Sequence, residues 1–175
     1  MVFAVGEIIE ILISSVAITY LFKDFLPMRT SEEEKWKIAA MIAIPSLVLH
    51  ELGHKFVALF YGLNATYHAN YSGLFIGMVL KYFNFPLFFV PAYVSFSGLG
   101  ATSQSLAIIA LSGPLLNLIL FLTAKTLLDQ NKGNSRQQVI LYFTKEVNKW
   151  LLLLNLLPLP GVDGYQAIKY LAASF

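Results

Sequence analysis

Apolar segments of membrane-spanning length restrict this chain more than any other feature of its sequence. Residues 2–22 are predominantly apolar and long enough to cross about 30 Å of hydrocarbon. A backbone in lipid must pair its own polar groups, and only helices and closed barrels do so. With 57% hydrophobic and 13% charged residues among 175, the chain is expected to be an integral membrane protein rather than a soluble domain.

The pattern predicts an all-α polytopic membrane protein with about four transmembrane helices and a small membrane-associated β-hairpin region. We expect one membrane-embedded domain over residues 1–175, with helices at about 2–22, 31–61, 102–128, 135–157 and, as a short C-terminal helix, 163–173. Residues 62–101 alternate turn-forming segments with β-favouring runs such as 87–90 and 93–96. These runs predict hairpin-like strands folded against the membrane face, since open strands cannot face lipid.

The second expected helix contains His50-Glu51-Leu52-Gly53-His54. Two imidazoles four residues apart lie on one helix face, which suits two ligands of a single zinc ion. Glu51 lies roughly 100° around the helix from His50, close enough to take a proton from water at the metal. The alternative is a buried helix whose ionisable groups are satisfied by hydrogen bonds, but such groups in lipid need partners or a wet cavity. The motif therefore predicts metal-dependent hydrolysis below the membrane surface.

A catalytic zinc usually has three protein ligands, and the chain has no cysteine. Asp24 and Asp129 occupy charged or polar loops, whereas Asp163 follows a proline-rich helix break in an apolar context. Asp163 is therefore the expected third ligand, with a turn-forming aspartate before glycine as the alternative. Asn155, about two turns earlier, is the best side-chain donor for an oxyanion or, alternatively, an interhelical hydrogen bond. His68 is expected to be an ordinary interfacial histidine.

Other polar residues in the apolar helices need interior partners. Glu7 and Glu10 are expected to face other helices or the interface, although they could instead line a water path. Gly113 and Pro114 loosen the third expected span and permit close approach to the metal helix, while Asn117 requires a partner within the protein.

Three blocks of the sequence, 50–54, 113–117 and 155–164, resemble those of site-2 proteases and occur in the same order. Site-2 proteases are intramembrane zinc metalloproteases, and the resemblance covers about residues 37–172. It implies that the two motif histidines and Asp163 hold one zinc ion and that Glu51 is the general base. It also implies that Asn155 helps to bind substrate or to stabilise the transition state.

The resemblance further implies a transmembrane protein substrate in a lipid bilayer. The strand expected to pair with that substrate includes Tyr93, Val94 and Ser95. The family places the zinc nearer the cytoplasm, whereas the short-loop basic residues favour a cytoplasmic location for 23–37 and 125–136. Departures from the family pattern at Ala92, Val162 and Tyr165 concern substrate fit rather than zinc binding.

Other functions fit the sequence less well. A membrane metalloprotease of a different class would use glutamate as its third ligand. A non-catalytic membrane binder or metal sensor on a protease scaffold would not require Glu51. A serine intramembrane protease needs glycine where Ala110 stands, and an aspartyl one needs two intramembrane aspartates. The net charge of +2, from scattered basic residues, predicts no nucleic-acid partner. The sequence gives no indication of oligomeric state.

Overall fold

The computed structural model describes residues 2–25, 30–85, 90–98, 100–131 and 133–174. This part of the chain is mostly helical and contains one two-stranded antiparallel sheet. In chain order the elements are α1 (Val5–Phe22), the 3-10 helix η1 (Lys23–Phe25), α2 (Glu32–Phe60), β1 (Asn64–Ala69), α3 (Tyr71–Tyr82), β2 (Ala92–Ser97), α4 (Ser103–Asp129), α5 (Ser135–Asn155) and α6 (Asp163–Ala172).

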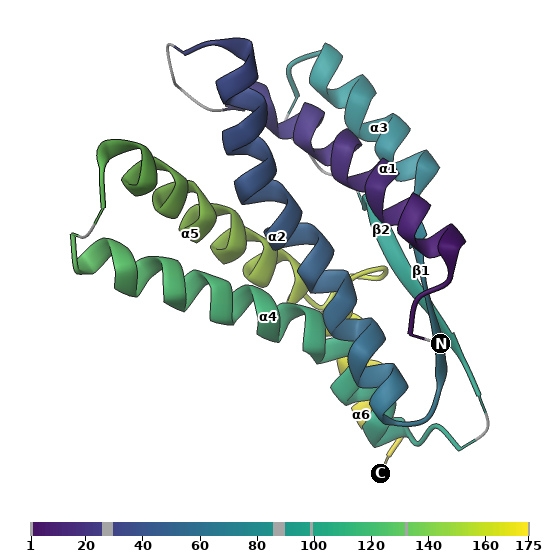
Figure 1. Cartoon of the computed structure of the whole chain (residues 1–175). Coiled ribbons are helices and arrows are strands. Elements are labelled where there is room, and N and C mark those ends of the chain that lie inside the picture. The colour runs from purple at the N-terminus through teal and green to yellow at the C-terminus, as the bar shows by residue number, and fades with distance from the viewer. Residues whose placement is uncertain (1, 26–29, 86–89, 99, 132, 175) are drawn as a thin grey trace.

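Helix α2 is the central element of the bundle. It contacts α1 and both strands on one side and α4 and α5 on the other (Figure 1). Its first half buries Ile38, Ala39 and Ile42 against Phe143 and Val147 of α5. Because α2 touches almost every other element, side chains on its different faces reach both the sheet and the helical half of the molecule.

Three helical segments, Val5–Phe25, Glu32–Phe60 and Ser103–Asp129, are long and apolar enough to cross a membrane. The fourth expected span, 135–157, does form helix α5, but among the described residues α5 is not a membrane-span candidate. The physical reason is its charge, since Lys145, Glu146 and Lys149 lie in mid-helix. The expectation of about four spans is therefore supported for three.

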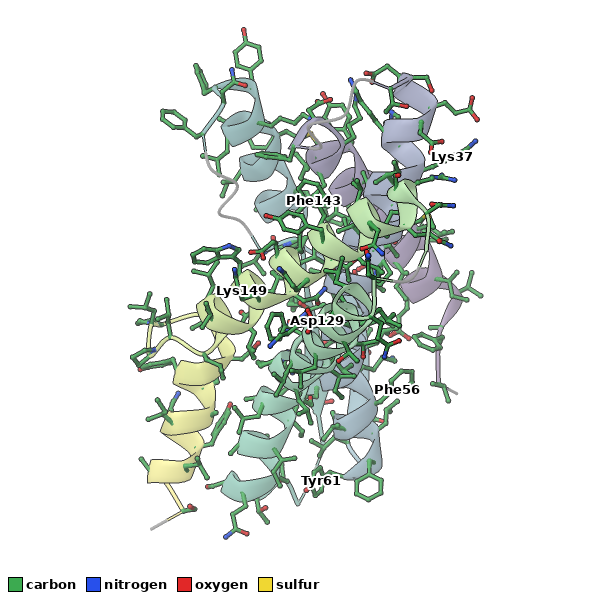
Figure 2. The ribbon with its side chains drawn as sticks, turned by 90° about the vertical axis from the view of Figure 1, so that its left-hand side faces the viewer. Lys37, Phe56, Tyr61, Asp129, Phe143 and Lys149 are labelled. Carbon is green, nitrogen blue, oxygen red and sulfur yellow. The ribbon has the colours of Figure 1, made fainter. Side chains whose placement is uncertain are left out.

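The ends of α2 differ in the way expected of a membrane helix. Figure 2 shows Lys37 near one end of α2, with Phe56 toward the other end and Tyr61 just beyond it. At the charged end, Ser31 accepts a hydrogen bond from the Glu34 N–H and caps the helix. Charged and aromatic side chains are favoured at the two membrane–water interfaces, so α2 suits a bilayer along most of its length.

The prediction of a β-rich region at residues 62–101 is correct for two strands and wrong for the segment between them. β1 and β2 pair antiparallel, with Tyr67 opposite Val94, but helix α3 lies between them in the chain. The Asn70 side chain caps the start of α3 by accepting a hydrogen bond from the Gly73 N–H. Of the predicted strand at 87–90, only Val90 lies within the described residues, and it belongs to no strand.

Helix α3 ends just before an asparagine that is equally compatible with a turn between strands. Asn84 has a positive φ of 56°, a conformation that asparagine tolerates better than most residues. Its N–H donates to the Lys81 carbonyl, and the Phe85 N–H donates to the Leu80 carbonyl. This pair of bonds is the Schellman motif that ends a helix. One of the turn-forming segments of this region therefore terminates α3.

Two carboxylates of α1 bind the outer edge of β1. Glu7 is buried. Its carboxylate accepts one hydrogen bond from the Lys55 ammonium and another, at 2.8 Å, from the Tyr67 N–H. Glu10 accepts one from the Ala69 N–H at 2.7 Å. As expected, Glu7 faces another helix, through Lys55 of α2, but the contacts of both glutamates with the backbone of β1 were not predicted. Their contacts occupy backbone donors that an edge strand would otherwise leave open.

Candidate metal centre

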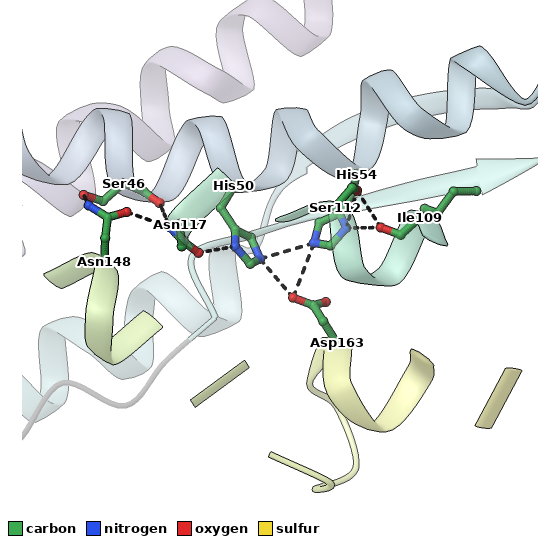
Figure 3. Close-up of polar contacts among 8 residues, drawn as sticks. All are labelled: Ser46, His50, His54, Ile109, Ser112, Asn117, Asn148 and Asp163. Carbon is green, nitrogen blue, oxygen red and sulfur yellow. Dashed lines mark hydrogen bonds and ion pairs between the residues drawn. The ribbon is translucent and has the colours of Figure 1, made fainter. Parts of the chain in front are cut away.

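Two histidines of α2 and the first residue of α6 converge between α2, α4 and α6 (Figure 3). His50 Nε2 lies 3.0 Å from Asp163 Oδ2, His54 Nε2 lies 3.4 Å from the same oxygen, and the two Nε2 atoms are 3.2 Å apart. Both histidines are buried, and the aspartate side chain is 22% exposed. Within the described residues, these three form the group of side chains that could hold a metal ion.

The loop between α5 and α6 delivers Asp163 to this position. Gly161 has a φ of +94°, which suits glycine in the turn that reverses the chain. A Cβ atom on Gly164 would lie 2.6 Å from the Leu156 carbonyl carbon and oxygen. Only glycine therefore lets the start of α6 lie directly on the end of α5. A carboxylate is also favoured at this point, because the N-terminus of a helix carries partial positive charge.

The Asn117 side chain of α4 determines which nitrogen of His50 faces the aspartate. The Asn117 Nδ2 group donates hydrogen bonds to the Ser46 carbonyl at 2.9 Å and to the Asn148 Oδ1 atom at 2.8 Å. Since a carbonyl only accepts, the amide cannot be reversed, and Asn117 Oδ1 must accept from His50 Nδ1 at 2.6 Å. The ring proton of His50 therefore lies on Nδ1, which leaves the Nε2 lone pair for a metal.

His54, like His50, is oriented by a group of α4, in this case a backbone carbonyl. Its Nδ1 atom donates to the Ile109 carbonyl at 2.7 Å, and the Ser112 hydroxyl donates to that carbonyl at 2.6 Å. The His54 proton is thus also on Nδ1, and Nε2 again faces inward. Sequence reasoning missed this contact because a backbone carbonyl leaves no residue-type signal.

The three inward-facing atoms fit a tetrahedral zinc ion. Ligand atoms held at about 2.0–2.2 Å from zinc at tetrahedral angles lie about 3.3–3.6 Å apart, and the observed separations of 3.0, 3.2 and 3.4 Å are close to that range. Asp163 Oδ2 is fully buried, yet it accepts no hydrogen bond from any residue that the structure describes. Such an oxygen is costly to bury alone, and a cation beside it removes that cost.

Electrostatics at Asp163 favour the form that binds metal. Burial raises the pKa of its carboxyl, whereas positive charge beside it lowers that pKa, to about 2 when His50 and His54 supply the charge as imidazolium groups with no metal bound. The group is therefore a carboxylate at neutral pH, as a metal ligand must be.

Glycine allows the close crossing of α2 and α4. A Cβ atom on Gly113 would lie 2.4 Å from His54 Nε2 and 2.8 Å from His50 Cε1, and one on Gly53 would lie 3.0 Å from the Ser112 carbonyl oxygen. The prediction that the Gly113-Pro114 notch brings α4 against the metal helix is confirmed. The notch provides the space that the imidazoles occupy.

Replacing Gly113 by alanine should displace both imidazoles and reduce zinc affinity by at least about 10-fold, the lower end of the loss caused by disturbing a ligand's orientation. Competition with a chromogenic chelator measures this affinity. Gly6→Ala is the matched control, because a Cβ there meets no atom within 4 Å. Equal zinc affinity in both variants would contradict this account of the notch.

A cleft of about 340 Å³ opens beside the three residues. Glu51 and Asn155 both line it, together with residues of β2, α4 and α6. Within the described residues no hydrogen-bond donor contacts the Glu51 carboxylate or the Asn155 amide. Both side chains are thus open to a molecule in the cleft.

Other candidates from the sequence lie elsewhere. His68 belongs to β1, where it contacts the Ser95 hydroxyl at 2.9 Å and stacks on Tyr93. Asp24 pairs with Lys81, 2.8 Å away, and Asp129 ends α4. None of these residues belongs to the group that could hold a metal.

Sequence reasoning missed Asn148 and Ser46, which contact Asn117 behind His50. A signal for Asn148 was present, because it stands seven residues before Asn155. Residues two helical turns apart share a face, so an inward Asn155 predicts an inward Asn148.

Comparison with known proteins agrees with this geometry. Residues 37–133 match the model of peptidase family M50, and this range contains His50, Glu51, His54 and Asn117. A protein of Methanocaldococcus jannaschii, provisionally named a zinc metalloprotease, is 32% identical over 171 residues, which cover 96% of this chain and 86% of that protein. No solved structure matches the chain. The resemblance noted from the sequence is thereby confirmed: the chain belongs to peptidase family M50, the site-2 proteases, whose metal is zinc.

Proposed function

We propose that the protein is an intramembrane zinc metalloprotease that hydrolyses a peptide bond within a transmembrane segment of another membrane protein. The observation that carries the proposal is the convergence of His50, His54 and Asp163 with Glu51 in one cleft. The two histidines and Glu51 lie on α2, a helix of membrane-spanning length. Membership of the M50 family supports a membrane metalloprotease, and the position of the cleft supports the more specific activity.

In the proposed reaction His50, His54 and Asp163 hold zinc, which when bound supplies Lewis-acid activation of water and of the scissile carbonyl. Glu51 takes the proton from the attacking water and later passes it to the leaving amine. The placement of Glu51 on the same helix as both histidines supports this role. Its carboxylate can accept the proton because no described residue already donates to it.

Asn155 is the proposed donor to the developing oxyanion. It ends α5 and lines the cleft with Asp163, and its amide makes no hydrogen bond to the described part of the chain. A single side-chain donor of this kind contributes about 3–4 kcal/mol to transition-state stabilisation in enzymes where it has been isolated.

The outer edge of β2 is the proposed site for an extended substrate. In an antiparallel pair, alternate residues direct their backbone groups toward and away from the partner strand. The Asn70 N–H donates to the Pro91 carbonyl at 2.9 Å, which sets the alternation. The β2 residues whose backbone groups face away from β1 are therefore Ala92, Val94 and Phe96.

This register refines the expectation from the sequence. Val94 directs its backbone groups to the open edge, whereas Tyr93 and Ser95 direct theirs to β1. Because Glu7 and Glu10 occupy the outer edge of β1, strand addition is favoured at β2, which lines the cleft. A substrate helix must unwind to pair there, so transmembrane segments with weak helix formers near the cut are the expected substrates.

The test is metal removal from the purified protein in proteoliposomes that contain a fluorogenic transmembrane peptide. We expect about one zinc per chain, loss of cleavage on chelation and recovery when zinc is restored, with the cut inside the membrane-spanning part of the peptide. A serine protease acting on the same peptide in the same vesicles controls for effects of the chelator on the substrate. A chain that binds no zinc, cleavage that survives chelation, or cuts confined to the flanks of the peptide would refute the proposal.

A further inference from the structure

A buried asparagine of α5 stands behind the metal centre without touching it. Asn148 is fully buried although it is polar. Its Nδ2 group donates to the Ser46 hydroxyl and to the Thr144 carbonyl, both at 2.8 Å, and its Oδ1 atom accepts from Asn117 at 2.8 Å. Helices α2, α4 and α5 thus meet at one side chain (Figure 3).

The direction of these hydrogen bonds is fixed from one end of the network to the other. The Thr144 carbonyl can only accept, so Asn148 must present Nδ2 to it and Oδ1 to Asn117. Asn117 must in turn present Nδ2 to Asn148 and Oδ1 to His50. Each amide has one arrangement that satisfies all its neighbours, and that arrangement requires the His50 proton on Nδ1.

The opposite arrangement would disable His50 as a ligand. A reversed Asn117 amide would present Nδ2 to His50 Nδ1, which would then have to accept, and the ring proton would move to Nε2. It would also set Asn117 Oδ1 against two acceptors, the Ser46 carbonyl and Asn148 Oδ1. Asn148 therefore contributes one of the two contacts that hold the Asn117 amide in the useful orientation.

We propose that Asn148 is a positioning residue of the metal centre, which keeps the Nε2 lone pair of His50 directed inward by fixing the amide of Asn117. The inference rests on the proposed role of His50 as a zinc ligand. Residues that orient a metal ligand in this way typically contribute about 10–100-fold to metal affinity. Asn148 acts through one intermediary and shares its task with Ser46, so its contribution lies near about 10-fold.

The experiment measures zinc affinity of the full chain in detergent by competition with a chromogenic chelator, together with the visible spectrum of the cobalt-substituted protein. Asn148→Leu keeps the branching at Cγ but removes every side-chain hydrogen bond, and about 10-fold weaker zinc binding with an altered cobalt spectrum is expected. Asn148→Asp keeps the acceptor that faces Asn117 and should bind zinc with close to wild-type affinity. This second variant keeps the test decisive if the leucine variant folds poorly.

Two controls separate positioning from packing. Val147→Ala, on the same helix, removes an apolar contact with α2 and should lower thermal stability without changing zinc affinity. In an Asn117→Ala background, Asn148→Leu should cause no further loss, because residues acting through one another are not additive. An additive loss, or wild-type affinity in Asn148→Leu, overturns the inference, whereas a wild-type chain that binds no zinc refutes the proposed function itself.

Discussion

Replacing Glu51 by glutamine is expected to lower the rate of transmembrane peptide cleavage by about 10²–10⁴-fold, the usual contribution of a general base. Glutamine keeps the size and position of the side chain but cannot take a proton from water. Zinc content should remain that of the wild type, because Glu51 is not among the three residues whose atoms converge. The variant thus separates proton transfer from metal binding.

The measurement pairs zinc analysis with single-turnover cleavage in proteoliposomes. Glu33→Gln is the matched control, since Glu33 is an exposed residue in the first turn of the same helix and pairs with Lys37. Its rate should equal that of the wild type. Unchanged cleavage in Glu51→Gln would remove Glu51 from the reaction, and loss of zinc would assign it to the metal instead.

Asp163→Ala should lose both zinc and cleavage. The change leaves two imidazoles and removes the carboxylate whose buried oxygen lies within 3.4 Å of both. The loss of zinc affinity should exceed the roughly 10–100-fold that disturbing an outer partner causes, because a direct ligand disappears. Unlike Glu51→Gln, this variant should fail the zinc analysis as well as the cleavage assay.

Asp129→Ala tests whether the effect is specific. Asp129 ends α4 and lies outside the group that could hold a metal, so zinc content and cleavage should remain unchanged. Zinc at full occupancy in Asp163→Ala would mean that another residue completes the site. A glutamate in that position would be the arrangement of a different class of membrane metalloprotease.

The local part of the site followed from helical periodicity. His50 and His54 are four residues apart, so any helix through them sets both rings on one face. The grouping with Asp163 was predictable for a chemical reason: without cysteine, and with Asp24 and Asp129 in polar surroundings, few carboxylates could face a buried metal. Asn155 followed from its spacing to the same helix break, and it does line the cleft.

The hairpin region shows where such reasoning fails. Residues 62–101 were expected to form a β-rich region, yet residues 71–82 within it form α3. Asn70 and Asn84 are compatible with turns and with helix caps, and only the hydrogen bonds of Gly73 and Phe85 distinguish the two. The count of about four spans is confirmed for three only: α5 is a helix of sufficient length, but because of its charged middle it is not a candidate span among the described residues.

The sequence by itself determined the membrane setting, the paired histidines with their glutamate, and the carboxylate most suited to join them, because these depend on composition and on repeats along one helix. Tertiary structure alone decided which ring nitrogens face inward and how closely α4 approaches. Those properties depend on Asn117, the Ile109 carbonyl and Gly113, groups far from the motif in the chain that reach it only when α2 and α4 cross.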